Sequence, residues 1–242
     1  MEHRTVRTPH ASWAKVNDIV YEESFGDLYH NFTAATIKQI EMYVQPPARI
    51  VDFGAGTGRL SIPLSQRGYK VVAVDPCREM LDDLLRKQGP GLSITTSVCR
   101  MQDFRTDEQF DMAVCAFTVL SYLLDEDTLE RSMHAVANSL RPGGQFLIDI
   151  PSRVIFQSYS KTTPKIKRSV TILQQKGDIY LYKESGAVSV GESIRPYSDE
   201  FLIRYWESEH IMKVLAKQGF SAKNNLTDCI PGTGSQYFLM AK

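Results

Sequence analysis

RIVDFGAGTGRLSIPLSQRG, residues 49–68, is the stretch of the sequence that decides the fold. It opens with an apolar pair, reaches a carboxylate at Asp52, and then carries three glycines at alternate positions, Gly54, Gly56 and Gly58. Glycine lets the backbone turn sharply and lets a ligand approach closely. The residues that follow predict a helix, whose N-terminus presents free N–H groups. A buried strand that turns through glycines into a helix is typical of a nucleotide site.

The spacing of the glycines narrows the kind of nucleotide site. Dinucleotide folds use G-x-G-x-x-G, in which the third glycine allows the helix to pack closely on the strand. Here the spacing is G-x-G-x-G, and Arg59 stands where that third glycine would be. A bulky side chain at this point argues against NAD. A phosphate-binding P-loop is excluded because no Gly-Lys-Ser/Thr follows, and an ordinary tight turn is the remaining alternative.

Asp75 is the second candidate site residue. It ends the apolar run of residues 71–74 and follows Asp52 by 23 positions. A carboxylate there is expected to lie beside the glycine turn, where it can accept both hydroxyls of a ribose. It could also cap the next helix, which the following Pro76 would suit. The two roles are compatible, and neither separates NAD from other nucleoside cofactors.

Strand and helix patterns alternate regularly through the middle of the chain. Apolar runs predict strands at residues 50–53, 71–75, 92–100, 110–120 and 144–151, and amphipathic spacing predicts helices at 76–87 and 125–140. Continuous apolar runs suit strands that are buried on both faces of a parallel sheet. This β-α-β-α order predicts an α/β fold with a doubly wound parallel sheet.

The chain divides into three parts by pattern. Residues 1–47 predict a helical segment, with a first helical pattern from residue 12, a break at Gly26 and a second helix over 33–43. Residues 48–151 and 206–242 form the predicted core, which ends in a helix over 210–220 and a strand over 235–242. Residues 152–205 lose helical spacing and predict an antiparallel β insertion, with strands around the Lys-Gly-Asp turn at 176–178 and further strands at 187–193 and 200–208.

Composition excludes several classes of function. The 242 residues carry 28 basic and 28 acidic side chains, so no global field favours nucleic acid or an anionic membrane. No apolar run reaches the length of a membrane span, and the first residues contain no apolar signal core, so we expect a cytoplasmic protein. The four cysteines and five histidines are scattered, which indicates reduced thiols and no metal centre. A monomer or a homodimer fits this composition.

Four motifs in order resemble the class I S-adenosylmethionine-dependent methyltransferases. They are DFGAGTG at 52–58, DPCREML at 75–81, FDMAVCAFTVLSYL at 110–123 and LRPGGQFLID at 140–149. The resemblance covers most of the chain outside the insertion. It implies a Rossmann-like, seven-stranded, mostly parallel sheet, with the insertion after the fifth strand as a lid. Within the family the chain is similar to small-molecule enzymes such as the sugar-amine and glycine N-methyltransferases.

The resemblance also implies roles for individual residues. S-adenosyl-L-methionine is the expected cofactor and S-adenosyl-L-homocysteine the product. Asp52 and the glycine backbone would hold the methionine end, Asp75 the ribose, and Met80 would pack near the adenine. The expected cofactor-binding residues are Asp52, Gly54, Ala55, Gly56, Gly58, Asp75, Pro76, Met80, Met101, Gln102, Phe117 and Tyr21.

One position departs from the family pattern. Relatives usually place an aspartate after the third strand to take the adenine amino group, and this chain has Arg100 there. Arginine has no acceptor and cannot make that bond. Either Gln102 or Asp103 substitutes, or the Met101 backbone and packing hold the adenine.

The acceptor end is less defined by the sequence. Tyr29, Tyr122 and Arg204 are expected near a small-molecule acceptor, with Tyr122 as the one candidate for a catalytic role. No histidine lies near the loop after the fourth strand, so no general base is expected, which favours a nitrogen acceptor over oxygen. The alternatives are an NAD(P)-dependent oxidoreductase and a non-catalytic module that binds S-adenosylmethionine.

Overall fold

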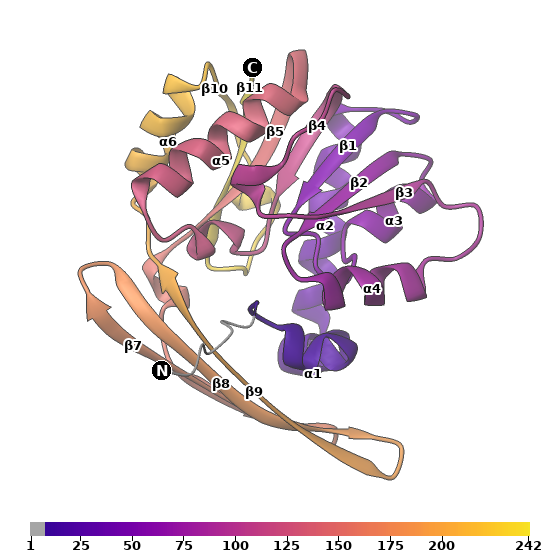
Figure 1. Ribbon diagram of the computed structural model, residues 1–242, viewed down its shortest axis with the longest axis vertical. Coiled ribbons are helices and arrows are strands. Elements are labelled where there is room, and N and C mark those ends of the chain that lie inside the picture. Colours follow the sequence, from indigo (N-terminus) through magenta and orange to yellow (C-terminus); the bar gives the residue numbers. More distant parts are fainter. Residues whose placement is uncertain (1–7) are drawn as a thin grey trace, which may run out of the picture.

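The computed structural model describes residues 8–242, so the first seven residues of the predicted 1–47 segment lie outside the described part. The chain forms a seven-stranded sheet flanked by helices and a separate four-stranded antiparallel sheet (Figure 1). The order of the large sheet is β10-β11-β5-β4-β1-β2-β3. Neighbouring strands from β3 to β5 pair in parallel, and β11 pairs antiparallel with both β5 and β10. The predicted doubly wound, mostly parallel sheet is confirmed.

The strands of the large sheet follow the apolar runs closely. Their bounds are β1 Arg49–Phe53, β2 Lys70–Asp75, β3 Ile94–Val98, β4 Phe110–Cys115, β5 Leu140–Pro151, β10 Ser221–Asn225 and β11 Ser235–Ala241. Two bounds differ from expectation by more than two residues, and one strand was not predicted. Strand β4 ends at Cys115, before the end of the predicted run at 110–120, because the backbone turns at Phe117 and Thr118, which have positive φ. Strand β5 begins directly after the preceding helix, because residues 141–144 join the strand, and β10 has no counterpart in the prediction.

Helices cover both faces of the large sheet. Their bounds are α1 Asn17–Phe25, α2 Asp27–Tyr43, α3 Ser61–Gln66, α4 Arg78–Lys87, α5 Glu126–Ser139 and α6 Ser208–Lys217. Apolar side chains of α5 and α6 pack on one face, and those of α2, α3 and α4 pack on the other. Helix α5 begins where Asp125 accepts a hydrogen bond from the Thr128 N–H at 2.7 Å, which satisfies a free donor of the first turn.

The N-terminal segment is helical for more of its length than its spacing predicted. A 3-10 helix, η1 (Ala11–Val16), leads into α1, and α2 begins at Asp27 rather than near residue 33. The break between α1 and α2 falls at Gly26, whose φ of 54° is costly for other residues. The predicted break is therefore right and the predicted start of the second helix is wrong, because polar residues at its beginning hide the helical pattern.

The insertion of residues 152–205 forms the small sheet, with strands β6 Tyr159–Thr162, β7 Ile166–Lys176, β8 Ile179–Val190 and β9 Ser193–Arg204. Its order is β6-β7-β8-β9 and every pair is antiparallel. The predicted turn at 176–178 joins β7 to β8. The run at 187–193 was expected to be a separate strand, but it continues β8 into the next turn, because residues 179–190 stay in register with β9 throughout.

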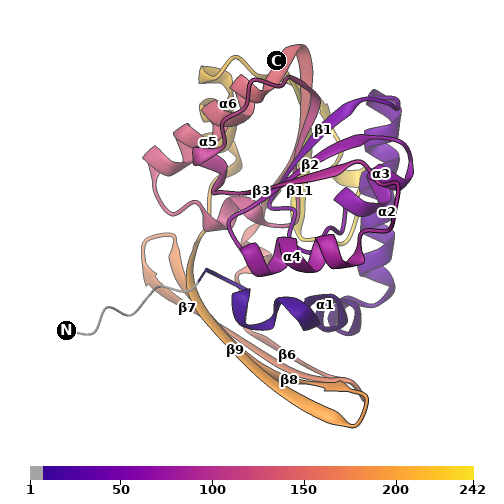
Figure 2. The ribbon, with the colours of Figure 1, turned by 45° about the vertical axis from the view of Figure 1, so that its right-hand side comes forward.

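The small sheet and the N-terminal segment face the same end of the core. Figure 2 shows α1 lying between α4 and strands β8 and β9. Trp13, Val16 and Val20 of the N-terminal segment form one apolar cluster with Ile166 and Val188 of the small sheet. The N-terminal segment is therefore fixed to the insertion as well as to the core. In the described part of the chain, no helix is both long enough and apolar enough to cross a bilayer.

Candidate functional site

A cavity of about 820 Å³ lies at the carboxyl ends of β1, β2 and β4, beside the glycine turn that follows β1. The range of small-molecule sites is roughly 300–1,000 Å³, so its size suits a cofactor and a second ligand. Three parts of the chain line it: the core loops after β1, β2, β3 and β4, the N-terminal segment, and residues of β8 and β9. The carboxyl ends of parallel strands are where open α/β sheets place their ligands.

The glycine turn lines this cavity with bare backbone. Gly54 has φ 73° and Gly56 has φ 53°, a left-handed backbone that side chains disfavour. A Cβ on Gly54 would lie 2.3 Å from Cγ2 of Val119, whereas a Cβ on Gly56 would have no atom within 4 Å. Gly54 therefore lets the loop after β4 approach, and Gly56 keeps a ligand-sized space open.

Asp75 joins the glycine turn to the start of α4. One carboxylate oxygen accepts the Gly56 N–H at 2.9 Å, and the other accepts the Cys77 N–H at 2.8 Å. The N-cap of α4 is Cys77 rather than Asp75, so the carboxylate closes a turn before the helix. Asp75 is 9% exposed, and burial raises its pKa although the two backbone donors oppose the shift. Each oxygen has a further lone pair, and Asp75 lines the cavity, so its carboxylate can also accept ligand hydroxyls.

Asp52 lies on the other side of the turn, at the end of β1. Its carboxylate accepts a 2.6 Å hydrogen bond from the Ser61 hydroxyl, and burial raises its pKa to about 6. Arg59 lies nearby, with its guanidinium 4.9 Å from the Phe32 ring centroid and 5.1 Å from that of Phe117. The arginine that replaces a third glycine thus lines the cavity and stacks on two aromatic rings instead of packing against a strand.

The loop after β3 holds the residues expected to contact the adenine in place of Arg100. Met101 and Gln102 are buried and line the cavity, and Arg100 lines it from an exposed position. Asp103 instead pairs with Arg131 of α5 at 3.0 Å and does not line the cavity. Of the three alternatives for the adenine contact, the position of Asp103 therefore excludes that residue.

Aromatic side chains form another wall of the cavity. Phe117 follows β4 with φ 78°, and its ring stacks on Phe32 at 5.1 Å and meets Tyr21 edge-on at 5.4 Å. Tyr21 stacks on Tyr29 at 5.9 Å. The backbone N–H of Thr118, next to Phe117, donates to the buried Asp149 carboxylate at 3.0 Å, which holds this strained turn in place.

His10, which the sequence patterns did not predict at the site, lies against Tyr122. His10 Nε2 is 2.7 Å from the Tyr122 hydroxyl, across 112 residues of sequence, and both residues line the cavity. The sequence places no histidine near the loop after β4, but the fold brings His10 to it. No local sequence signal marks His10, because the N-terminal segment carries it across the cavity.

Most of the predicted residues meet at the cavity, and two do not. The lining includes Asp52, Gly54, Ala55, Gly56, Asp75, Pro76, Met80, Met101, Gln102, Phe117, Tyr21, Tyr29 and Tyr122. Gly58 does not line it, because a Cβ there would meet Leu84 and Ile62 between the helices. Arg204 does not line it either, since its guanidinium stacks 3.6 Å from the Trp206 ring centroid and donates to the Leu124 carbonyl at 3.1 Å.

The donors and acceptors of the cavity fit a nucleoside that carries an amino acid. Asn17 is 5% exposed, lines the cavity, and its side-chain amide nitrogen has no partner among the described residues. A buried donor without a partner is costly and indicates a missing acceptor. Together with the Asp75 carboxylate and the open space at Gly56, it suits a ligand that bears both hydroxyls and a carboxylate.

Residues 50–144 match a family profile described as a methyltransferase domain. The chain carries a methyltransferase domain over these residues. The matched residues hold strands β1 to β4, the glycine turn and Asp75, and so contain most of the core wall of the cavity.

Sequence relatives share this methyltransferase domain over part of their length. The chain is 32% identical over 119 residues to a putative methyltransferase, YqeM, of Bacillus subtilis, which covers 48% of this chain and 47% of that protein. It thus matches about half the length of the curated relatives.

Solved structures share the fold of the whole chain. An S-adenosylmethionine-dependent methyltransferase from Clostridium acetobutylicum superposes with a TM-score of 0.82 at 22% identity, over 95% of this chain and 98% of the other. The sugar N-methyltransferase KedS8 from a Streptoalloteichus species superposes with a TM-score of 0.75 at 19% identity, over 100% and 98%. The chain therefore shares its arrangement of core and insertion with these proteins.

Proposed function

We propose that the protein transfers the methyl group of S-adenosylmethionine to a nitrogen of a small-molecule acceptor. One observation carries the proposal. A single cavity joins the Asp75 and glycine-turn wall, suited to a nucleoside, to an aromatic wall built by Phe117, Tyr122 and the N-terminal segment. A cavity with both walls has room for a cofactor and an acceptor side by side.

The residues of the first wall are assigned to the cofactor by their chemistry. Asp75 would accept the two ribose hydroxyls, and Met80, Met101 and Gln102 would border the adenine. Asp52 would face the amino group of the methionine, and the unpartnered amide of Asn17 would donate to its carboxylate or to a hydroxyl. These contacts would fix the cofactor with its methyl group toward the aromatic wall.

The remaining work is to position the acceptor. The bound cofactor supplies an electrophilic methyl group on a positively charged sulfur. Holding an acceptor lone pair in line with it can remove about 7–11 kcal/mol of a barrier in favourable cases. The aromatic wall excludes water and keeps an amine neutral, since burial disfavours its charged form. This requirement, with the neutral net charge of the chain, supports a small molecule over nucleic acid.

A nitrogen acceptor agrees with the name of one structural relative, because KedS8 is described as a sugar N-methyltransferase. The insertion has a sequence pattern unlike that of the core. We expect it to select the acceptor, as loops on a fixed scaffold commonly do.

A methyl-transfer screen tests the proposal. Cofactor labelled in the methyl group is incubated with the protein and a panel of primary and secondary amines, matched alcohols and a metabolite extract. Label should move to an amine, and Asp75→Ala should abolish the transfer. Transfer to no fraction by a protein that binds the cofactor would overturn the proposal, and transfer to alcohols alone would overturn the choice of nitrogen.

A further inference from the structure

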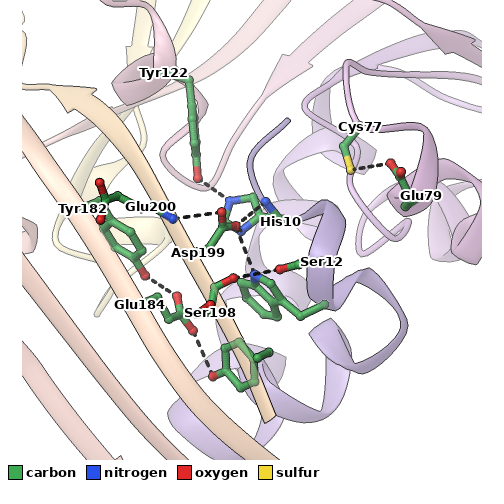
Figure 3. A network of polar contacts seen from close by, with 12 residues as sticks. His10, Ser12, Cys77, Glu79, Tyr122, Tyr182, Glu184, Ser198, Asp199 and Glu200 are labelled. Atoms are coloured by element: carbon green, nitrogen blue, oxygen red, sulfur yellow. Dashed lines mark hydrogen bonds and ion pairs between the residues drawn. The ribbon is translucent and has the colours of Figure 1, made fainter. Parts of the chain in front are cut away.

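His10 lies where three distant parts of the chain meet. Its Nε2 is 2.7 Å from the Tyr122 hydroxyl of the loop after β4, and its Nδ1 is 3.7 Å from the Asp199 carboxylate of β9. Its backbone N–H also donates to Asp199. Figure 3 shows Tyr122 pointing to His10, which lies beside Asp199. The imidazole thus links the N-terminal segment, the core and the insertion at the wall of the cavity.

The ring is held in one orientation by its neighbours. It meets Trp13 at 5.2 Å and Phe201 at 5.2 Å, both edge-on, and the Trp13 indole N–H donates to Asp199 at 3.2 Å. A carboxylate that accepts from Trp13 and from the His10 backbone is itself fixed. Packing of this kind preorganises a reactive group, because little motion remains to be ordered during a reaction.

The surroundings determine which form the ring takes. Burial lowers the pKa of His10, and Asp199 and the more distant Glu184 oppose the shift while Arg168 adds to it. Burial raises the pKa of Tyr122, so the phenol keeps its proton. A neutral imidazole beside a protonated phenol accepts the phenol hydrogen bond at Nε2 and carries its own proton on Nδ1, toward Asp199.

We infer that Tyr122 and His10 together take up the proton that the acceptor amine must lose. The inference rests on the proposed function, and Tyr122 is the catalytic residue that touches the acceptor. As the N–H bond of the ammonium breaks, its electron pair stays on nitrogen and the proton passes to the Tyr122 oxygen. The phenol proton passes at the same time to His10 Nε2, which becomes an imidazolium facing Asp199. The charge moves from the acceptor to the imidazole, and the amine gains the lone pair needed for attack.

The form of the ring can be measured without knowing the acceptor. Two-bond 1H–15N spectra of the protein with S-adenosylhomocysteine report the tautomer and titration of each of the five histidines, with His10→Gln giving the assignment. We expect a neutral Nδ1–H tautomer at pH 7, a shift of the Nε2 resonance in Tyr122→Phe, and a still lower pKa in Asp199→Asn. An Nε2–H tautomer, or a ring that is charged at pH 8, would overturn the inference.

The kinetic test uses the acceptor found in the methyl-transfer screen. Tyr122→Phe and His10→Gln should lower kcat by roughly 100-fold or more, with cofactor Kd within about twofold. Both should flatten the acidic limb of the kcat/KM pH profile. The matched variants Tyr43→Phe and His134→Gln, whose residues do not line the cavity, should leave the profile unchanged.

The two tests separate the two proposals. Full activity or an unchanged pH profile in Tyr122→Phe and His10→Gln would overturn the inference and leave methyl transfer standing. A screen that finds no acceptor would overturn the proposed function, and the tautomer measurement would still decide whether the pair is set to accept a proton.

Discussion

Gly54 and Val119 pack so closely that one added carbon atom, the Cβ of an alanine at Gly54, should disturb both the fold and the site. An alanine at Gly54 would adopt φ 73° and would place its Cβ 2.3 Å from Val119 Cγ2 and 3.0 Å from Cγ1. The left-handed backbone costs an L-residue roughly 1–2 kcal/mol. Overpacking of this kind costs a further 1–3 kcal/mol, approximately. Gly54→Ala should therefore lower the free energy of unfolding by about 2–5 kcal/mol.

Gly56→Ala is the matched control, because its φ is 53° and its Cβ would meet no atom within 4 Å. It should cost only about 1–2 kcal/mol, although it should weaken cofactor binding by filling the cavity. Urea unfolding followed by circular dichroism measures both variants. The double variant Gly54→Ala/Val119→Ala should recover the overpacking part only, giving a coupling energy of roughly 1–3 kcal/mol. Equal costs for the two alanine variants, or no coupling to Val119, would refute this reasoning.

Two further predictions follow from buried charges. Burial raises the pKa of Asp52 to about 6, so this carboxyl is protonated below that pH, and cofactor affinity measured by titration calorimetry should rise with pH and level off above 6. The affinity for the cofactor should fall about tenfold for each pH unit below 6. Asp52→Asn should remove this pH dependence, whereas Asp149→Asn, whose residue lies outside the cavity, should keep it. A flat pH profile in the unmodified protein would contradict the assignment of Asp52 to the cofactor. Separately, Arg168 and Glu184 form a buried ion pair at 2.8 Å in the insertion. Glu184→Gln should cost about 3–5 kcal/mol in urea unfolding. Lys183→Ala, which breaks the exposed Lys183–Glu200 pair, should cost less than about 1 kcal/mol. Similar costs for the two variants would show that the buried pair does not stabilise the insertion.

The core of the fold could be predicted because its sequence signals are local. Strands β1, β2 and β4 are continuous apolar runs closed by a carboxylate or a turn, and helix α5 has both a capping Asp125 and a regular apolar face. Contacts between the ends of neighbouring strands, such as the one between Gly56 and Asp75, follow from strand order alone, because the carboxyl ends of neighbouring parallel strands meet at one edge of the sheet.

The elements that were missed lack such signals. Strand β10 is SAKNN, with all five residues exposed, so it shows no alternation of apolar and polar side chains and forms only because β11 offers an edge. Arg168 follows Lys165 and Lys167 in the sequence, a cationic pattern that usually indicates a solvated strand edge. Its guanidinium is instead buried against Glu184, which lies 16 residues away on the next strand. Sequence spacing does not reveal a pair of charges that meets only across a hairpin.

The candidate site likewise has one wall that the sequence predicts and another that it does not. The wall near the cofactor comes from loops directly after strands, and motif spacing places it. The wall near the acceptor joins His10, Tyr122 and Asp199 from three distant segments, so only the packing of the N-terminal segment between core and insertion brings them together. This explains why His10 was missed although thirteen of the predicted residues line the cavity.

The most direct measurement is titration calorimetry of S-adenosylmethionine, with NAD⁺ as the comparison, on the unmodified protein and on Asp75→Ala. Hydrogen bonds to a charged group contribute about 1.5–3 kcal/mol each, so loss of the carboxylate should weaken binding by at least roughly tenfold while the fold remains intact. We expect saturable binding of S-adenosylmethionine, no binding of NAD⁺, and this loss of affinity in Asp75→Ala. Tight binding of NAD⁺ alone, or unchanged affinity for S-adenosylmethionine in the folded variant, would contradict it.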